Sequence, residues 1–516
     1  MKHRFYIFSL CFLLLVLGSA LRAQDVQRFS ERQIIGTARY VGIGGAMTAI
    51  GGDPSAALDN PAGLGLYRRS EITLTIDETI DHTTQPLNNS TQPLHNRYTR
   101  SRFAAPQVSA IWSWGNPTKQ RGLIYNNLMF SINRLANYNR DVVVNGRNTG
   151  MVETMCLLTQ GVAEQDFDEN AWNNENIGWL SILGYNGYLI NPVVDSLADD
   201  PMKKYQWIPA VDFTEGTLSI SESGNYDQYA LSWAGNISNQ WYVGVALNIP
   251  TLSYTKHVSL TETDRVNSAE LKSMYHLSGV GVSGTLGLIY RPIQALRIGA
   301  SFQTPTIMTL SVQTEGDMYS TISGQKYDVL TPESGIMTTN MVSPLRTSVS
   351  VAGQLGSIGL LAVQYDYAHS AEMEDVHTLR VGAEAQVTRG LFLNAGYVYE
   401  SSFIKEDPIW MLGYNEVRTD MDYRYTQSTQ YASVGFGYRS DAIVAQLAYQ
   451  YRWQILHQYA SECQVLPMDV GTHTHRLVAT LAWRFSDRAQ MAYDNGVEQY
   501  TYIEPRRNDL TQIRKY

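Results

Sequence analysis

The sequence predicts an all-β protein, a transmembrane antiparallel β-barrel of about 14 strands with an N-terminal plug in its lumen. Three observations carry this prediction. Short segments alternate apolar and polar residues with period two, which is typical of strands with one apolar face. The 516 residues include 33 Tyr, 10 Trp and 40 Gly, and aromatic residues favour the membrane–water interface. The connections between the segments alternate in length, as turns and outer loops do in outer-membrane barrels.

Residues 1–23 are predicted to be a secretory signal peptide. Lys2 and Arg4 form a basic start, residues 5–18 are almost wholly apolar, and Ala23 is a small residue at the cleavage position. A spanning helix needs about 20 apolar residues, so a membrane anchor is the weaker alternative. A signal peptide on a barrel sequence predicts location in the bacterial outer membrane.

The predicted mature chain is acidic. Removal of Lys2, Arg4 and Arg22 with the signal leaves 36 basic against 48 acidic residues, a net charge of −12. This balance argues against nucleic acid as a partner. Cys156 and Cys463 remain, and they allow one disulfide in an oxidising compartment.

The strand pattern is clearest in residues 379–387, 443–453 and 477–485, where every second residue is apolar. Counting such segments places strand starts near residues 70, 105, 122, 226, 241, 278, 296, 345, 359, 377, 391, 430, 443 and 474. Short connections are expected near 116–120, 238–240, 292–295, 356–358, 388–390 and 440–442, and long ones near 78–104, 137–225, 258–277, 310–342, 402–428 and 456–472. A soluble β-sandwich shows no such alternation of loop length and has fewer strands, so the barrel (residues 70–485) is favoured. The polar residues 486–516 are expected to form a periplasmic tail.

Residues 24–69 differ from the rest because they are rich in Gly and Ala. The run from Ala38 to Ala46 suggests a dinucleotide-binding loop, but Met47 stands where the third glycine should be, and no strand precedes the run. We therefore expect these small residues to let the backbone lie close against a barrel wall.

Three short motifs in this segment, Gly42-Ile43-Gly44-Gly45-Ala46, Gly52-Asp53-Pro54-Ser55-Ala56 and Asn60-Pro61-Ala62-Gly63-Leu64, resemble the N-terminus of the FadL/TodX family. Members of that family are outer-membrane transporters of long-chain fatty acids and related hydrophobic compounds. The resemblance implies a 14-stranded barrel closed by an N-terminal hatch, here residues 24–69. It also implies that a ligand passes from an apolar groove on the outer loops to a lumenal pocket and then past the hatch. The candidate gate residues are Gly42, Gly44, Gly45, Asn60, Pro61, Ala62 and Gly63.

The expected partners are outer-membrane lipid or lipopolysaccharide and a hydrophobic small molecule. No energy-coupling motif lies near the mature start, which fits passive diffusion. A monomer is expected, because barrel closure removes the sheet edges through which strands of different chains pair.

The predicted loop insert 137–225 is longer than the family pattern and unusually apolar. Its apolar residues are spaced by three and four, which predicts two short amphipathic helices. Trp179, Leu180, Leu183 and Tyr188 are candidate ligand-contacting residues of a hydrophobic landing site. The alternative is that the helices cap the barrel and pack on themselves.

The predicted lumen face carries mixed charges, with Arg380, Glu384, Arg452 and Arg476 as the main candidates. Further members of the set are Arg297, Asp366, Glu400, Arg439 and Arg484. Such charges usually form internal ion pairs. One of the arginines could instead hold a fatty-acid carboxylate through a bidentate hydrogen bond.

Other functions have weaker signals. Some relatives anchor exported proteins, so a docking or secretion-assembly role is the first alternative. His473 and His475, on one face of the last strand, suggest a haem receptor, but further metal ligands are lacking. Asp420-Met421-Asp422 lacks the glycine and glutamate of a calcium loop. No catalytic set stands out, so neither enzyme activity, a cofactor nor a metal is expected.

Overall fold

The computed structural model describes residues 23–485, apart from 86–95, 117, 334–335, 357, 371–373, 403–415 and 465. The predicted tail 486–516 and the signal peptide up to residue 22 lie outside the described residues. So do the central parts of two predicted outer loops, 78–104 and 402–428.

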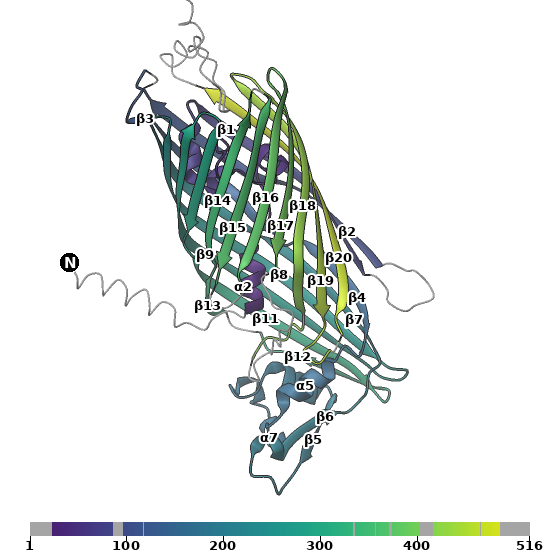
Figure 1. Cartoon of the computed structure of the whole chain (residues 1–516). Coiled ribbons are helices and arrows are strands. Elements are labelled where there is room, and N and C mark those ends of the chain that lie inside the picture. Colours follow the sequence, from purple (N-terminus) through teal and green to yellow (C-terminus); the bar gives the residue numbers. More distant parts are fainter. Residues whose placement is uncertain are drawn as a thin grey trace, which may run out of the picture.

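The described strands form a closed antiparallel barrel of 14 strands, in which β20 pairs with β1 (Figure 1). Eleven of the 14 are single elements: β1 (Ser70–Gln85), β2 (Asn96–Gly115), β7 (Glu215–Ile237), β8 (Trp241–Thr263), β9 (Ser268–Ile293), β15 (Gly359–His369), β16 (Val376–Thr388), β17 (Leu391–Ser401), β18 (Tyr423–Arg439), β19 (Ile443–Tyr459) and β20 (Met468–Phe485). The predicted fold class and strand number are therefore confirmed.

The other three strands of the barrel are interrupted. They are β3 (Leu123–Asn137) with β4 (Arg140–Arg147), β10 (Leu296–Gln303) with β11 (Ile307–Ile322), and β13 (Met337–Val342) with β14 (Leu345–Leu355). Pro305 and Pro344 stand at two of the breaks, where a residue without an N–H cannot complete the ladder. β12 (Gln325–Leu330) forms a hairpin with the end of β11.

The six predicted short turns are present, but the strands run further than expected at the opposite end of the barrel. Only residues 264–267 connect β8 to β9, so the expected loop 258–277 is instead mostly strand. Residues 140–147 and 215–225, assigned from the sequence to the long insert, also belong to strands β4 and β7.

The extra strand length was missed because the polarity of the two strand faces reverses along each strand, as β8 shows most clearly. Val245 and Ile249 face outward and are exposed, whereas outward positions further along, such as Thr255, are polar. Inward positions change in the opposite sense, from Asn248 to Leu260. An apolar exterior suits lipid and a polar exterior suits water. β8 therefore leaves the membrane near Ile249, and its remaining part belongs to a section of the barrel that is surrounded by water.

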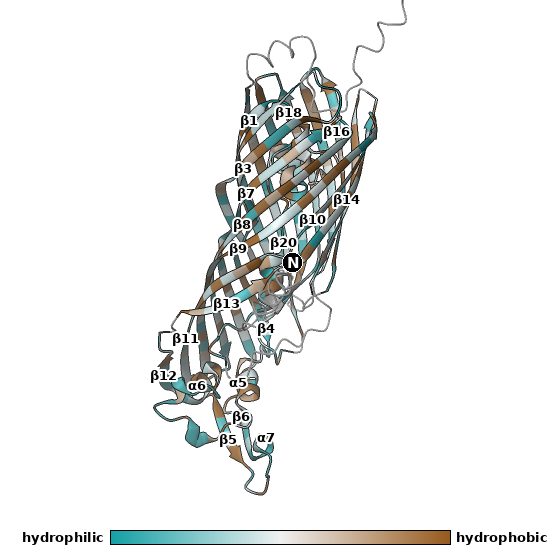
Figure 2. Ribbon diagram, turned by 90° about the vertical axis from the view of Figure 1, so that its left-hand side faces the viewer, coloured by the Kyte–Doolittle hydropathy of each residue, from teal (hydrophilic) through white to brown (hydrophobic). Residues whose placement is uncertain are grey.

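Aromatic side chains flank the apolar outer band, as they do in outer-membrane barrels. Exposed members near the short turns are Trp112, Trp114, Trp241, Tyr438 and Trp483, and those toward the other end are Tyr229, Tyr365, Tyr397, Tyr399 and Tyr449. Figure 2 shows hydrophobic residues recurring along β7, β8 and β9. No helix among the described residues is both long and apolar enough to cross a bilayer.

The N-terminal segment lies inside the barrel (Figure 1). It contains α2 (Ala23–Ser30), α3 (Ala38–Gly42), α4 (Ala56–Asp59) and the 3-10 helix η1 (Pro61–Leu66). Its apolar side chains pack in several cores with inward residues of the barrel wall, and one of these cores joins Ile43 and Met47 to Leu360 and Val398. Burial against the wall stabilises these short helices, which are too short to form alone.

Residues 148–214 fold on the end of the barrel that carries the long loops (Figure 1); we call them the insert. The insert contains α5 (Met151–Thr159), η2 (Glu164–Asp166), η3 (Ala171–Asn173), α6 (Trp179–Asn186), β5 (Ile190–Val194), α7 (Pro201–Lys204) and β6 (Tyr205–Pro209). Its core is continuous with inward residues of the barrel mouth, such as Leu218 and Leu260. The insert therefore packs into the mouth.

Candidate functional site

Six inward-facing glycines of the barrel wall contact the part of the N-terminal segment that lies toward the short turns. We call them the glycine seat: Gly244 (β8), Gly287 (β9), Gly299 (β10), Gly382 (β16), Gly396 (β17) and Gly435 (β18). A Cβ on Gly396 would meet the backbone of Gly44, and one on Gly244 would meet Ala62. Backbone therefore packs on backbone around much of the wall, an approach that only glycine allows.

The predicted gate residues all lie in this contact zone. Gly44 and Gly45 have φ of +65° and +69°, a left-handed conformation that favours glycine. Gly42 lies against Gly435, and Gly63 packs on the backbone of Gly51.

The Asn60-Pro61-Ala62 element forms the start of η1. The Asn60 side-chain oxygen accepts from the Ala62 N–H over 3.0 Å, which caps the helix. Its Nδ2 donates to the carbonyl of Thr48 over 2.8 Å and to that of Leu288 in the wall over 3.3 Å. Pro61 occupies the first turn, where a missing N–H does no harm.

Two ion pairs join the segment to strand β16. Arg39 Nε donates to Glu384 Oε2 over 2.8 Å, and Arg380 Nη1 lies 3.3 Å from Asp59 Oδ2. Arg380 also pairs with Asp366 over 2.7 Å. Burial raises the pKa of Asp59, and the Arg380 guanidinium opposes that rise. The sequence had singled out Arg380 and Glu384 but neither of their partners, Arg39 and Asp59.

The other predicted lumen charges also contact the N-terminal segment or pair within the wall. Arg476 donates to the Ile34 carbonyl over 3.1 Å and lies 3.4 Å from Asp77. Arg452 donates to Thr474 over 3.0 Å and lies 3.9 Å from Asp81. The geometry therefore matches internal ion pairing, and carboxylate binding by one of these arginines stays a prediction.

A second layer of charge, which the sequence did not reveal, surrounds helix α2 nearer the insert. Arg28 of α2 lies 3.5 Å from Glu222 and 3.2 Å from Asp422, and Asp25 pairs with Arg418 over 2.5 Å. The layer continues through Lys256, Asp420, Arg140 and Arg424. These residues are scattered along the chain, so only the folded barrel brings them together.

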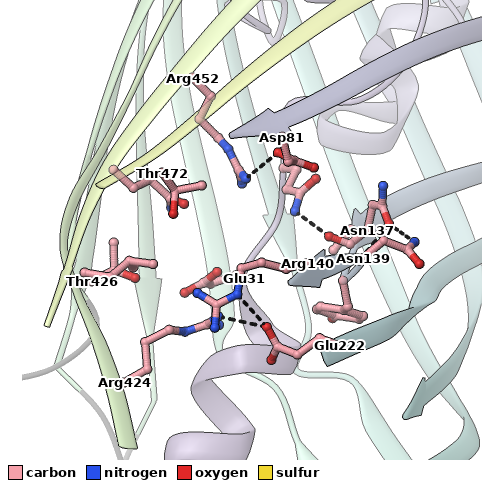
Figure 3. Close-up of a pocket in the computed structure, with 15 residues that line it drawn as sticks. Glu31, Asp81, Asn137, Asn139, Arg140, Glu222, Arg424, Thr426, Arg452 and Thr472 are labelled. Atoms are coloured by element: carbon pink, nitrogen blue, oxygen red, sulfur yellow. Dashed lines mark hydrogen bonds and ion pairs between the residues drawn. The ribbon is translucent and has the colours of Figure 1, made fainter. Parts of the chain in front are cut away.

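Two cavities lie in the described lumen beside these charges, and both are small and lined mainly by polar side chains. One of about 50 Å³ lies beside Arg140, Arg424 and Arg452, and one of about 30 Å³ lies beside Arg346 and Arg380 (Figure 3 shows the first). The resemblance to the FadL/TodX family implied a lumenal pocket for a hydrophobic ligand. Neither cavity has room for such a ligand in this conformation.

The barrel wall has a gap in its backbone pairing. β2 pairs with β3 from Gln107 to Gly115. The N-terminal part of β2, residues 96–106, pairs with β1 alone. Pro106 stands at this point, and a bulge interrupts the β1–β2 register. Side chains bridge the gap instead: Arg100 donates to Asp141 over 3.0 Å and Arg102 to Asn225 over 2.8 Å.

Three of the four candidate loop residues are buried. Trp179 is 6% exposed, Leu180 2% and Leu183 0%, because they form part of the insert's own cores. Tyr188 is exposed and its ring packs 4.3 Å from that of Tyr327. A ligand would reach the three buried side chains only after the insert opened.

The remaining sequence candidates lie away from the lumen. His473 and His475 are on the outward face of β20, and each Nδ1 is hydrogen-bonded to a tyrosine hydroxyl, of Tyr451 and Tyr449. Among the described residues no three His, Cys, Asp or Glu side chains are grouped to hold a metal ion. Cys156 and Cys463 are free thiols.

Comparison with known proteins adds a structural likeness. No protein-family model and no curated protein sequence matches the chain. The structure of a Pseudomonas aeruginosa FadL homologue matches with a TM-score of 0.51 at 10% identity, over 88% of this chain and 100% of that one. The P. putida toluene transporter TodX matches with a TM-score of 0.49 at 11% identity, over 88% of this chain and 100% of that one. The CymD monoaromatic hydrocarbon channel matches with a TM-score of 0.48 at 13% identity, over 89% of this chain and 100% of that one. The first of these likenesses shows a shared fold.

Proposed function

We propose that this chain, which has the FadL/TodX-type channel fold, carries hydrophobic small molecules passively across the bacterial outer membrane. The N-terminal segment, residues 24–69, is then a hatch that gates the lumen. The glycine seat is the observation that carries the proposal, because it docks a separate segment against the wall through non-covalent contacts between backbones. A docked segment can leave its seat without breaking the barrel.

The conformation described here is the closed one. The insert fills the outer mouth and the hatch fills the lumen toward the short turns, so passage requires that both move. The gap in backbone pairing beside residues 96–106 of β2 supports a sideways exit of the ligand through the barrel wall, because only side chains bridge this gap. Outer-membrane lipid surrounds the apolar band, and a monomer suffices for this mechanism.

Uptake of labelled oleate by cells that lack the gene tests the proposal. Complementation with the intact gene should restore uptake, and complementation with a variant lacking residues 38–66 should give non-selective leak instead. Equal oleate uptake with and without the gene would rule out transport of this class of compound. Surface labelling of an inserted epitope tag provides the control for correct assembly.

A docking or secretion-assembly role is the second candidate, and two observations favour it. The two cavities described above are too small for a hydrophobic ligand, and the insert carries ten acidic residues against Lys203 and Lys204. An acidic folded body at the barrel mouth suits a basic partner. Cross-linking of whole cells that recovers a basic exported protein with the insert, together with unchanged oleate uptake, would favour this role over transport.

A further inference from the structure

A cavity of about 50 Å³ lies between the end of α2 and the break between β3 and β4 (Figure 3). We call it the arginine cavity, because Arg140, Arg424 and Arg452 line it. A buried water needs about 10–15 Å³ of such volume, so the cavity has room for a few waters or a group of similar size. An alkyl chain does not fit within it.

Buried donors face the arginine cavity without acceptors. Arg140 Nη1 and Nη2, the Tyr138 hydroxyl and Thr472 Oγ1 have no hydrogen-bond partner within the described part of the chain. Arg140 is 8% exposed, Tyr138 9% and Thr472 3%. Buried donors are nearly always satisfied in folded proteins, so several unsatisfied ones around one cavity indicate a missing acceptor.

The carboxylates nearby do not supply the missing acceptor for Arg140 Nη1 and Nη2. Glu222 is shared by three guanidiniums: Arg140 Nε lies 2.8 Å away, Arg424 Nη1 3.3 Å and Arg28 Nε 3.5 Å. Asp81 is engaged by Arg452 and Thr474. Glu31 is the third carboxylate of the lining, so three guanidiniums and three carboxylates line the cavity.

We propose that the arginine cavity binds an oxyanion, a carboxylate or phosphate group, between Arg140 and Tyr138. The Nε of Arg140 is held by Glu222, which leaves both Nη atoms for the ligand, and a planar guanidinium recognises such groups through two parallel hydrogen bonds. The oxyanion is either a free ion or the head group of an amphiphile. Binding of an amphiphile's head group rests on the proposed transport function, whereas binding of a free ion does not.

Calorimetric titration of the purified full-length protein in a non-ionic detergent tests the proposal. The ligands are inorganic phosphate, acetate, decanoate and decanol. Saturable binding of phosphate, acetate or decanoate is expected, with none for decanol. Arg140→Gln should weaken binding at least about tenfold, because it removes charge-assisted hydrogen bonds.

Tyr138→Phe is the second variant, because it removes one donor and keeps the ring that packs on Phe29 and Tyr254. Tyr138→Phe should weaken oxyanion binding severalfold with the barrel intact. If Arg140→Gln does not assemble, the affinity of Tyr138→Phe tests the proposal instead. Arg265→Gln, on the exposed β8–β9 connection, is the matched control and should bind like the wild type.

The outcomes separate cleanly. Decanoate binding more than tenfold tighter than acetate supports a head-group site, and equal affinities support a free-ion site. Absence of saturable binding by all three oxyanions overturns the proposal, as does unchanged affinity in both variants. Oxyanion binding together with oleate uptake that does not depend on the gene would refute transport and leave the arginine cavity standing.

Discussion

Arg39 of the hatch and Glu384 of β16 form an ion pair that lies wholly inside the barrel. Nε donates to Oε2 over 2.8 Å and Nη2 to Oε1 over 3.2 Å, and each side chain is 1% exposed. Removing one member of a buried pair leaves the other charge unpaired, which typically costs about 3–5 kcal/mol. The pair therefore opposes departure of the hatch from its seat.

The first prediction is that Glu384→Ala loosens the hatch. Arg39 would be left buried without its partner, so the docked state should weaken by about 3–5 kcal/mol and the barrel should leak ions. Conductance in planar bilayers measures the leak. The double variant Arg39→Met/Glu384→Leu, which leaves no buried charge, should leak less than Glu384→Ala alone. An equal or larger leak from the double variant would show that the unpaired charge of Arg39 is not what loosens the hatch, and a leak no greater than that of the wild type in Glu384→Ala would show that the ion pair does not hold the hatch.

The second prediction concerns the glycine seat. Gly396→Ala places a methyl group against the backbone of Gly44, and overpacking of this kind typically costs about 1–3 kcal/mol. The hatch must shift, so conductance and cleavage of the hatch by added protease should both rise. Gly353→Ala is the matched control, because a Cβ on this wall glycine meets no atom within 4 Å. If both variants behave alike, the seat is not a docking surface.

The barrel itself was predictable from local pattern. In β19 the outward residues Ile443, Leu447 and Tyr449 alternate with inward ones, and lipid on one side enforces that period wherever the strand crosses the membrane. The same rule explains where the prediction was wrong. Beyond Ile249 the outer face of β8 meets water, the apolar residues move to the inner face, and the alternation no longer resembles a membrane strand.

The site was only partly predictable, because its contacts are long-range. The Gly- and Ala-rich hatch stands out in the sequence, but Arg39 pairs with a residue 345 positions away. Register between strands decides which inward glycine meets the hatch. Gly396 and Gly353 look alike in sequence, since both are strand glycines, and only the fold places one against Gly44 and leaves the other open.

The third prediction tests the insert as an apolar landing site. The Asn148 N–H lies 3.4 Å from the Thr214 carbonyl oxygen, so a short Gly-Ser linker can replace residues 149–213 without straining β4 or β7. The barrel should assemble, because its ladder is complete without the insert, and oleate uptake should fall severalfold. Heat-modifiable migration on gels checks assembly. Undiminished uptake would show that ligand enters without the insert.

The fourth prediction uses Cys156 to report opening of the insert. Its thiol is 5% exposed, and burial raises its pKa to about 12. The thiolate is the reactive form, so maleimide labelling in the Cys463→Ser background should be slow at neutral pH and rise about tenfold per pH unit below that pKa. Cys156 lies in the core that also contains Leu180 and Leu183.

A hydrophobic ligand can reach that core only by opening it. Oleate should therefore accelerate labelling of Cys156 if the insert is a landing site, with mass spectrometry as the measure. Labelling of the denatured protein gives the upper limit of the rate, and acetate is the control for a carboxylate without an apolar chain. A rate that oleate leaves unchanged, alongside normal uptake, would assign the insert to closing the barrel mouth and would place ligand entry elsewhere on the outer surface.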